Sequence, residues 1–231
     1  MRLFLIGLML SFAACLSGCS GGNDSPRGAS PTAVSDDGSP QSSATPQRNL
    51  PKIVAFGDSL TAGYGLSPAE SYPSLLQKKL DADGYEYEVV NAGVSGDTTA
   101  GGVRRIDWSL EGDVRVVIVE LGANDFLRGQ SPAEAKKNLT QIIERSKSRG
   151  ARVLLAGLYT TTNAGRNYEG QISDAYVSLA REQGVPIIPF FLEGVAGIET
   201  LNQEDRVHPN AQGTKIVADT VYKYLKPMLE K

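Results

Sequence analysis

Residues 52–65 read Lys52-Ile53-Val54-Ala55-Phe56-Gly57-Asp58-Ser59-Leu60-Thr61-Ala62-Gly63-Tyr64-Gly65. The apolar run from Ile53 to Phe56 is short and uninterrupted, which is typical of a fully buried strand. Gly57 ends the run, and Asp58 and Ser59 are small polar residues suited to a turn or a helix start. In open α/β sheets the ligand crevice lies just beyond the carboxyl ends of the strands. We therefore interpret Ser59 as a candidate nucleophile; the alternative is that Asp58 or Ser59 only caps a helix.

The composition of the 231 residues is that of an ordinary globular protein, with 41% hydrophobic and 21% charged residues. The formal net charge is -3, so the chain lacks the basic excess typical of nucleic-acid binding, and we expect no such partner. His208 is the one histidine in the sequence. A mechanism that needs an imidazole therefore has a single candidate.

Residues 1–18 are predicted to be a lipoprotein signal peptide. Arg2 supplies a positive start, and the apolar run from Leu3 to Leu16 is too short to span a bilayer of roughly 30 Å. The run ends in Leu16-Ser17-Gly18-Cys19, which resembles the bacterial lipobox, where the cysteine is lipidated and becomes the mature N-terminus. The alternative is an ordinary secretory signal that happens to contain cysteine.

Residues 19–50 are rich in Ser, Gly, Pro, Asp, Gln and Thr and contain almost no large apolar side chain. Such a segment cannot bury enough surface to offset its ordering entropy, so we expect a disordered tether with an r.m.s. reach of about 30 Å. Cys15 and Cys19 are the two cysteines of the chain, which leaves the mature domain no thiol for a disulfide, a metal site or catalysis.

The N-terminal features predict an extracytoplasmic protein that is anchored to a membrane by lipid at Cys19. Ser20 directly follows the cysteine, which resembles the outer-membrane sorting pattern of two-membrane bacteria. In such a cell we expect the protein on the periplasmic face of the outer membrane.

From residue 51 to residue 231, apolar runs alternate with helical periodicity. This alternation predicts a single α/β domain with a parallel sheet covered on both faces. Besides the strand over residues 53–56, strands are predicted over residues 85–90, 114–121, 152–158 and 185–191. Helices are predicted within residues 72–84, 132–150, 172–184 and 217–225. A capping box with proline at the first helical position, Ser131-Pro132-Ala133-Glu134, opens the second of these helices.

Three further loops carry clusters of polar residues: residues 91–99, 121–125 and 205–210. The first two follow strands and should emerge at the same edge of the sheet as the first strand, and the third precedes the last helix. Convergence of such loops on one crevice is the geometry expected of an active site. Within the first loop, Asp97 is interpreted as the cap of a helix at Thr98.

An attacking serine needs a base, and His208 is the only imidazole available. Asp205, three residues upstream, can orient that ring. The developing oxyanion needs fixed donors, each worth about 3 kcal/mol in the transition state. The candidates are the backbone N–H groups of Ser59 and Gly93 and the side-chain amide of Asn124.

Each of these residues has a structural alternative. A histidine before proline can be a surface or cap residue, whereas Pro209 favours a fixed loop, since it biases His208 away from helical geometry and can start the last helix. Gly93 can serve only a tight turn, and Asn124 or Asp125 can be a plain N-cap. The joint occurrence of all of them in this order favours the catalytic interpretation.

Four blocks in this chain resemble those of the GDSL/SGNH hydrolase superfamily: Gly57-Asp58-Ser59-Leu60, Gly93, Gly122-Ala123-Asn124-Asp125 and Asp205-Arg206-Val207-His208. The longer strings over residues 57–66, 91–98 and 121–129 are similar to the periplasmic arylesterase, acyl-CoA thioesterase and lysophospholipase subgroup. Ala123 departs from that subgroup, which often has a second glycine there. The resemblance extends from about Lys52 to the C-terminus.

The resemblance implies a flavodoxin-like three-layer α/β sandwich with a five-stranded parallel sheet. It implies Ser59 as nucleophile, Asp205 and His208 as the rest of a triad, and an oxyanion hole made by Ser59, Gly93 and Asn124. It implies a mechanism with no cofactor and no metal, and we expect a monomer. The G-x-S-x-G elbow of the α/β-hydrolases is absent.

The implied substrate is a small-molecule acyl ester or thioester. Phe126, Leu127 and Tyr159 are candidates to line an acyl-binding groove, as the corresponding loops do in the subgroup; the alternative is that they cover the sheet edge. A second enzymatic alternative is deacetylation of carbohydrate or peptidoglycan, which other members of the superfamily perform. The alternative outside enzymes is a ligand-binding lipoprotein on the same scaffold, although neither of the common phosphate-binding glycine patterns occurs at the first crevice.

Overall fold

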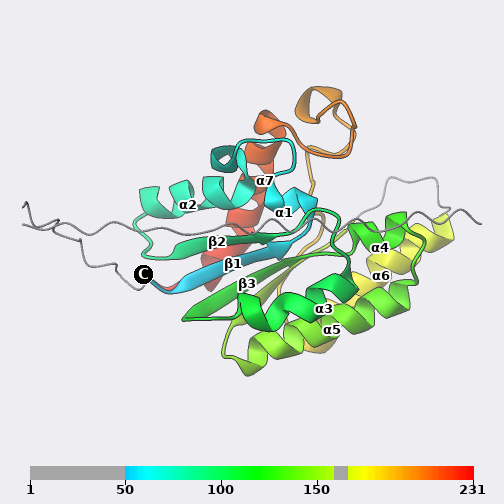
Figure 1. Ribbon diagram of the computed structural model, residues 1–231, viewed down its shortest axis with the longest axis horizontal. Coiled ribbons are helices and arrows are strands. Elements are labelled where there is room, and N and C mark those ends of the chain that lie inside the picture. Colours follow the sequence, from blue (N-terminus) through cyan, green and yellow to red (C-terminus); the bar gives the residue numbers. More distant parts are fainter. Residues whose placement is uncertain (1–49, 159–165) are drawn as a thin grey trace, which may run out of the picture. The chain divides into compact units, whose positions relative to one another are not determined.

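The structure is a computed structural model that describes residues 50–158 and 166–231 (Figure 1). The predicted signal peptide, the predicted tether up to residue 49 and the lipidation site Cys19 lie outside the described residues, as does Tyr159. Within the described ranges, no helix combines the length and the apolar character needed to cross a membrane.

Five parallel strands form one sheet in the order β2-β1-β3-β4-β5. Their bounds are β1 Lys52–Gly57, β2 Glu88–Gly93, β3 Val114–Glu120, β4 Arg152–Ala156 and β5 Ile187–Ile188. This order is that of a flavodoxin-like sheet, in which the ligand crevice lies between β1 and β3, where the winding reverses. Ser59 follows β1 and therefore lies at this switch point.

Strands β1 and β3 form the buried centre of the sheet, as five of the six residues of β1 and six of the seven of β3 are buried. Their carboxyl ends are in register: Gly57 lies opposite Gly93 of β2 on one side and opposite Glu120 of β3 on the other. The loops that leave these three strands therefore start side by side.

Helices cover both faces of the sheet (Figure 1). Helices α2 Tyr72–Ala82 and α7 Ala211–Leu225 lie on one face, and α3 Thr99–Ser109, α5 Pro132–Ser148 and α6 Arg166–Gln183 lie on the other. Each face has its own hydrophobic core, one around Ile53 and Val221 and the other around Phe56 and Ile142. The remaining short elements are α1 Ser59–Ala62, α4 Ala123–Leu127 and the 3₁₀ turns η1 Pro68–Glu70, η2 Glu199–Leu201 and η3 Lys226–Met228.

The predicted fold class is confirmed, but two strands differ from their predicted ranges by more than two residues at one end or both. Strand β2 covers Glu88–Gly93 instead of residues 85–90. Strand β5 is reduced to Ile187–Ile188 because Pro186 and Pro189 flank it, and proline has no N–H to give to a sheet ladder.

Two predicted helix starts were wrong. Helix α7 begins at Ala211, where Asn210 caps it by accepting from two backbone N–H groups of the first turn, so Pro209 lies before the cap. Helix α3 is capped by Thr98, whose hydroxyl accepts from the first turn of the helix, and not by Asp97. The carboxylate of Asp97 is used instead in an ion pair described below.

Candidate active site

Ser59 is the first residue of α1, immediately beyond the carboxyl end of β1. Asp58 caps this helix, because its Oδ1 accepts from the N–H of Leu60 at 3.0 Å. The helix ends after one turn at Gly63, whose φ of 79° lies in the left-handed region that favours glycine. Because the first N–H groups of a helix have no partner within it, the N–H of Ser59 has no acceptor in α1.

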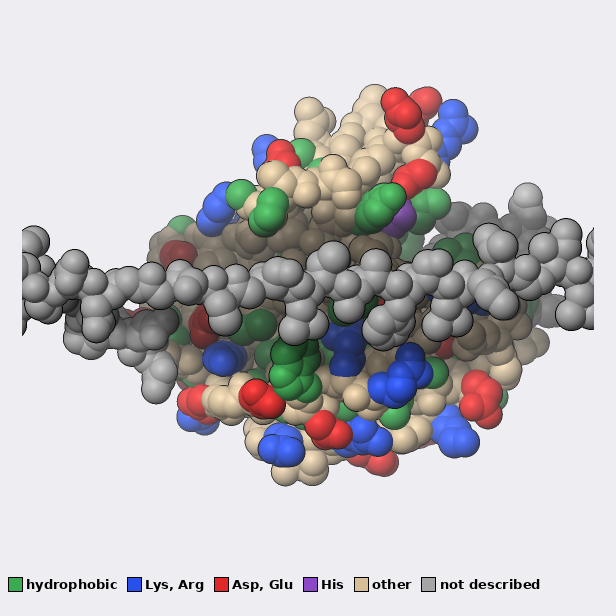
Figure 2. Space-filling view, viewed as in Figure 1, with side chains coloured by type: hydrophobic (Ala, Val, Ile, Leu, Met, Phe, Trp, Pro, Cys, Tyr) green, Lys and Arg blue, Asp and Glu red, His purple; other side chains and the backbone are tan. Residues whose placement is uncertain are grey.

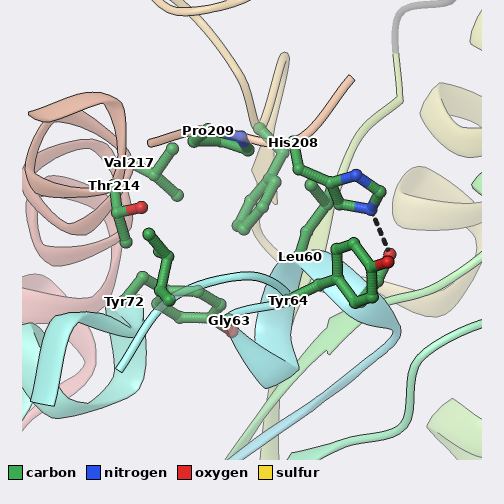
Figure 3. A pocket seen from close by; sticks show the side chains of 11 residues that line it. Leu60, Gly63, Tyr64, Tyr72, His208, Pro209, Thr214 and Val217 are labelled. Carbon is green, nitrogen blue, oxygen red and sulfur yellow. Dashed lines mark hydrogen bonds between the residues drawn. The ribbon is translucent and has the colours of Figure 1, made fainter. Parts of the chain in front are cut away.

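A chain of hydrogen bonds joins Ser59, His208 and Asp205. The Nε2 atom of His208 lies 2.9 Å from Ser59 Oγ, and its Nδ1 lies 2.7 Å from Asp205 Oδ2. Figure 3 shows the imidazole turned toward the serine hydroxyl. If Nδ1 donates to the carboxylate, Nε2 is left to accept the hydroxyl proton.

Asp205 also shapes the loop that carries the histidine. Its Oδ1 accepts from the backbone N–H groups of Val207 at 2.9 Å and His208 at 3.0 Å. Partial burial opposes ionisation, but the bonds from the His208 backbone and ring and from Val207 lower the pKa of Asp205 to about 2. The carboxylate is therefore ionised at neutral pH. Arg206, between Asp205 and Val207, has a φ of 60°, which is a strained backbone conformation for a residue other than glycine. The bonds from Val207 and His208 to Asp205 help to hold this conformation.

Gln203 connects the histidine loop to the segment after α1. Its Nε2 donates to the carbonyl oxygens of Tyr64 at 2.7 Å and Pro209 at 3.0 Å, and its backbone N–H donates to the carbonyl of His208 at 2.8 Å. The ring of Tyr64 lies beside that of His208 with centroids 4.8 Å apart (Figure 3). Backbone and ring contacts thus fix the imidazole relative to the serine helix.

Asn124 is the second residue of α4 and reaches the site from the end of β3. Its Nδ2 donates to Asp58 Oδ2 at 3.1 Å, which uses one of its two amide hydrogens and leaves the other for a ligand. Asp125 accepts from the backbone N–H and the hydroxyl of Thr99 at 2.8 and 2.5 Å, and so ties α4 to the start of α3. Neither residue is the N-cap of α4, which is Gly122.

Gly93 ends β2, and its N–H donates to Asn91 Oδ1 at 3.0 Å. A Cβ at this position would lie 2.2 Å from the backbone nitrogen of Ala62. A glycine is therefore required for steric reasons, because the end of β2 approaches α1 so closely. This steric requirement is separate from any role of the N–H as a donor.

Arg105 of α3 is a positioning residue that the sequence analysis missed. Its guanidinium pairs with Asp97 at 2.7 Å and donates to the carbonyl oxygens of Ala92 and Gly57, both at 2.8 Å. It also lies over the ring of Phe56, 4.0 Å from the centroid. Arg105 therefore holds the carboxyl ends of β1 and β2 together. The sequence did contain one signal for this ion pair: the acidic Asp97 precedes the helix, and Arg105 lies two turns into it.

An open crevice lies beside Ser59, enclosing about 610 Å³ with its solvent-open part included. Its walls combine polar and apolar residues: Asp58, Ser59, Leu60, Tyr64, Ser95, Gly96, Ala123, Asn124, Leu127, Val207 and His208. Tyr64, Leu127 and Val207 expose 55%, 63% and 52% of their surface. Figure 2 shows the histidine at the surface with hydrophobic side chains next to it. A smaller hollow next to the imidazole is lined by residues that include Tyr72, Thr214 and Val217 (Figure 3).

Of the residues predicted to line a groove, Leu127 lies on the wall of the crevice. The prediction for Phe126 was wrong, because its ring is buried in the core and packs edge-on against Tyr168 and Tyr176. Adjacent residues of a short helix point in different directions, so Leu127 faces solvent where Phe126 faces the core. Tyr64 and Val207 were not predicted to line the crevice.

A flavodoxin-like sheet with serine, imidazole and carboxylate joined by hydrogen bonds at its switch point defines the SGNH class of serine hydrolases. Residues 55–216 match the GDSL-like Lipase/Acylhydrolase family, and the chain belongs to this family.

Named relatives agree with this assignment. The chain is 39% identical to Esterase TesA of Pseudomonas aeruginosa over 186 residues, which are 80% of this chain and 92% of that protein. It is 38% identical to Thioesterase 1/protease 1/lysophospholipase L1 of Escherichia coli over 178 residues, 77% of this chain and 84% of the relative. The crystal structure of the psychrotrophic esterase EstA from Pseudoalteromonas sp., inhibited by monoethylphosphonate, superposes with a TM-score of 0.73 at 33% identity, covering 76% of this chain and 97% of that one.

The protein is therefore a serine hydrolase that acts on ester bonds, an esterase or thioesterase of the GDSL type. The alternative of a ligand-binding protein without catalysis does not hold.

Proposed function

We propose that the protein hydrolyses acyl esters and thioesters through an acyl-enzyme on Ser59. The observation that carries the proposal is the hydrogen-bonded sequence from Ser59 through His208 to Asp205. His208 takes the proton of Ser59 as the oxygen attacks the acyl carbonyl, and gives it to the departing alcohol or thiol. It then takes a proton from water, which attacks the acyl-enzyme, and returns it to Ser59 as the acid leaves.

The oxyanion of each tetrahedral intermediate needs donors in fixed positions. We assign this role to the N–H of Ser59, to the free amide hydrogen of Asn124 and to the N–H of Gly93. The last of these is hydrogen-bonded to Asn91 Oδ1, so Gly93 contributes only if that bond is shared or broken during the reaction.

The substrate we propose is an ester or thioester with one acyl chain, such as an aryl ester, an acyl-CoA or a lysophospholipid. Tyr64, Leu127 and Val207 give the crevice apolar walls beside the nucleophile, which favours an acyl chain over a sugar. The name of the Escherichia coli relative, which includes thioesterase and lysophospholipase, supports the same substrate class. Deacetylation of carbohydrate or peptidoglycan is less well supported.

We further propose that the enzyme acts outside the cytoplasm, attached by lipid at Cys19 and as a monomer. The support is the lipobox-like string before Cys19 and the polar tether that follows it. Replacement of Cys19 by serine should release the protein into the soluble extracytoplasmic fraction. Unchanged membrane association of the Cys19→Ser protein would contradict this location.

Turnover of p-nitrophenyl butyrate, an acyl-CoA, a lysophospholipid and an acetylated sugar tests the proposed function. Ser59→Ala and His208→Ala should abolish hydrolysis of every substrate that the parent cleaves. Ser148→Ala is the control, since Ser148 is an exposed serine at the end of α5 that does not line the crevice, and it should retain most of the activity. Undiminished turnover by the Ser59→Ala protein would refute the mechanism.

A further inference from the structure

Two carboxyl groups are completely buried beneath the nucleophile, and the mechanism above uses neither of them. Asp58 follows β1, Glu120 ends β3, and both side chains are 0% exposed. Gly57 precedes Asp58 in the chain and pairs with Glu120 across the sheet, and a Cβ on it would be 2.6 Å from Glu120 Oε2. Because Gly57 has no side chain, the carboxylate of Glu120 fits against it.

The two oxygens of Glu120 have different surroundings. Oε2 accepts from the hydroxyl of Thr61 at 2.8 Å and lies 3.4 Å from the backbone nitrogen of Asp58. Oε1 is buried and finds no donor among the described residues. A buried oxygen without a donor is costly if the carboxylate is ionised, and protonation of Glu120 lowers this cost by removing the charge.

Among the described residues, Asp58 and Glu120 have no cationic side chain paired with them. The guanidinium of Arg105 is engaged with Asp97 and two carbonyl oxygens, and no ion pair to Asp58 or Glu120 occurs in the described ranges. The other titratable groups facing Glu120 are the buried hydroxyls of Tyr72 on α2 and Tyr176 on α6. Two adjacent carboxyls in such a site cannot both ionise, so they share one proton.

The hydrogen bonds decide which group keeps the proton. Asp58 accepts from the N–H of Leu60 and from the amide of Asn124, and both bonds favour its ionised form. Burial raises the pKa of Asp58 to about 6, although the bond from the N–H of Leu60, the hydrogen bond with the carboxyl of Glu120, the nearby His208 and the bond from Asn124 all lower it. Burial, and then the negative charge of Asp58, raise the pKa of Glu120 well above its ordinary value. At neutral pH Asp58 is thus the anion and Glu120 the acid.

We propose that Glu120 is a positioning residue of the reaction: its protonated carboxyl donates to Asp58, and Asp58 thereby holds the amide of Asn124 where it meets the oxyanion. The relation of Asp58 to Asn124 parallels that of Asp205 to His208, since in both cases a carboxylate orients a donor. Because Asn124 is an oxyanion donor only in the mechanism proposed above, the role of Glu120 rests on that mechanism.

Glu120→Ala and Glu120→Gln separate this role from a structural one. Glutamine keeps a neutral donor toward Asp58 and an acceptor for Thr61, so Glu120→Gln should hydrolyse p-nitrophenyl butyrate with a kcat within about threefold of the parent. Glu120→Ala removes the hydrogen bond that supports Asp58, so the amide of Asn124 is no longer held in place. Since a misplacement of a catalytic group by about 1 Å can lower the rate on the order of 100-fold, kcat should fall at least about tenfold. KM should change less than about twofold in both, because an oxyanion donor acts in the transition state.

The decisive comparison is made in a second background that lacks the amide. In the Asn124→Ala protein, Glu120→Ala should lower kcat less than about threefold further, because residues that act through one another are not additive. The same fold loss in both backgrounds would mean that Glu120 only supports the structure, and would overturn the proposal. A Glu120→Gln protein as impaired as Glu120→Ala would overturn the assignment of the proton.

Thermal unfolding of each variant shows whether it is folded. If Glu120→Ala does not fold, Asp58→Asn replaces it in the same comparison, since Asp58 accepts from Leu60 on one oxygen and from Asn124 on the other, and an amide keeps only one of these oxygens. The loss of kcat in Asp58→Asn should likewise depend on Asn124. Ser59→Ala distinguishes failure of the proposed mechanism from failure of the role of Glu120. If it retains the turnover of the parent, the proposed mechanism fails, whereas an inactive Ser59→Ala protein with additive Glu120 and Asn124 effects refutes only the role of Glu120.

Discussion

Gly57 and Glu120 are paired residues of neighbouring strands, and a Cβ on Gly57 would clash with both the backbone carbonyl and the carboxylate of Glu120. That Cβ would lie 2.6 Å from Glu120 Oε2 and 2.0 Å from Thr61 Oγ1. The first glycine of the block that carries Ser59 is thus required by what packs beneath it, and not by its backbone conformation.

Gly57→Ala should therefore destabilise the protein by about 1–3 kcal/mol, the usual cost of overpacking a closely packed interior. Gly170 provides the matched control, because it lies within α6 and a Cβ there would meet nothing within 4 Å. Gly170→Ala should be neutral or stabilise by up to about 1 kcal/mol. Urea unfolding of both variants measures the difference, and equal stability of the two would contradict the packing described here.

Glu120→Gln should change how stability depends on pH. In the unfolded chain Glu120 loses its proton above its ordinary pKa of 4.5, whereas in the folded chain burial and Asp58 keep the proton bound. The folded state then binds more protons, so the parent loses about 1.4 kcal/mol of unfolding free energy per pH unit through this group.

The glutamine variant lacks this loss, so its stability relative to the parent should rise between pH 4.5 and the raised pKa of Glu120. Urea unfolding at intervals from about pH 5 to about pH 8 measures the change. A stability difference that stays constant over this range would mean that Glu120 is ionised in the folded protein.

Arg105→Ala should destabilise the protein by about 2–3 kcal/mol, because it leaves Asp97 and two carbonyl oxygens without their charged donor. Arg105→Lys should not restore the parent, since an ammonium cannot reach all three acceptors with the fork of a guanidinium. The neighbouring Arg104 is an exposed control, and among the residues that the structure describes its guanidinium bonds to the carbonyl of Ala100. Arg104→Ala should lie within about 0.5 kcal/mol of the parent. Similar losses at positions 104 and 105 would refute the special role of Arg105.

Leu127→Asp should reduce kcat/KM for long acyl chains more than for short ones. Each buried CH₂ contributes about 0.8 kcal/mol, so loss of contact with two groups lowers kcat/KM for p-nitrophenyl decanoate by roughly tenfold while the acetate is nearly unaffected. Val177→Asp is the control, as Val177 is 56% exposed and does not line the crevice. Equal rates from acetate to decanoate in the parent would show that the crevice does not hold the acyl chain.

How far the sequence predicts this structure depends on the range of the interactions involved. The alternation of apolar runs and helical periods predicts five strands and their covering helices, because the pattern of buried side chains is a property of each segment of sequence by itself. Strand β5 is shorter than predicted because Pro186 and Pro189 interrupt a ladder that hydrophobicity alone would extend. Motif order predicts that Ser59, Asp205 and His208 act together, and hydrogen bonds join the three side chains in the structure.

The parts that were missed depend on contacts between elements. Glu120 interrupts an apolar strand, but only the pairing with β1 places it beneath Asp58. In the sequence Arg105 is indistinguishable from an ordinary helix residue. Only the folded structure shows that its guanidinium bonds to the ends of β1 and β2. Leu127 and Phe126 are equally hydrophobic, and only the docking of α4 decides which of them faces the core.

The central claim is that Ser59 is the nucleophile, and mass spectrometry of the protein treated with a fluorophosphonate tests it most directly. We predict one phosphonyl group per molecule, located on the peptide that contains Ser59 and absent from the His208→Ala protein, whose serine has no base. A label on another residue, or full labelling of the Ser59→Ala protein, would contradict the account.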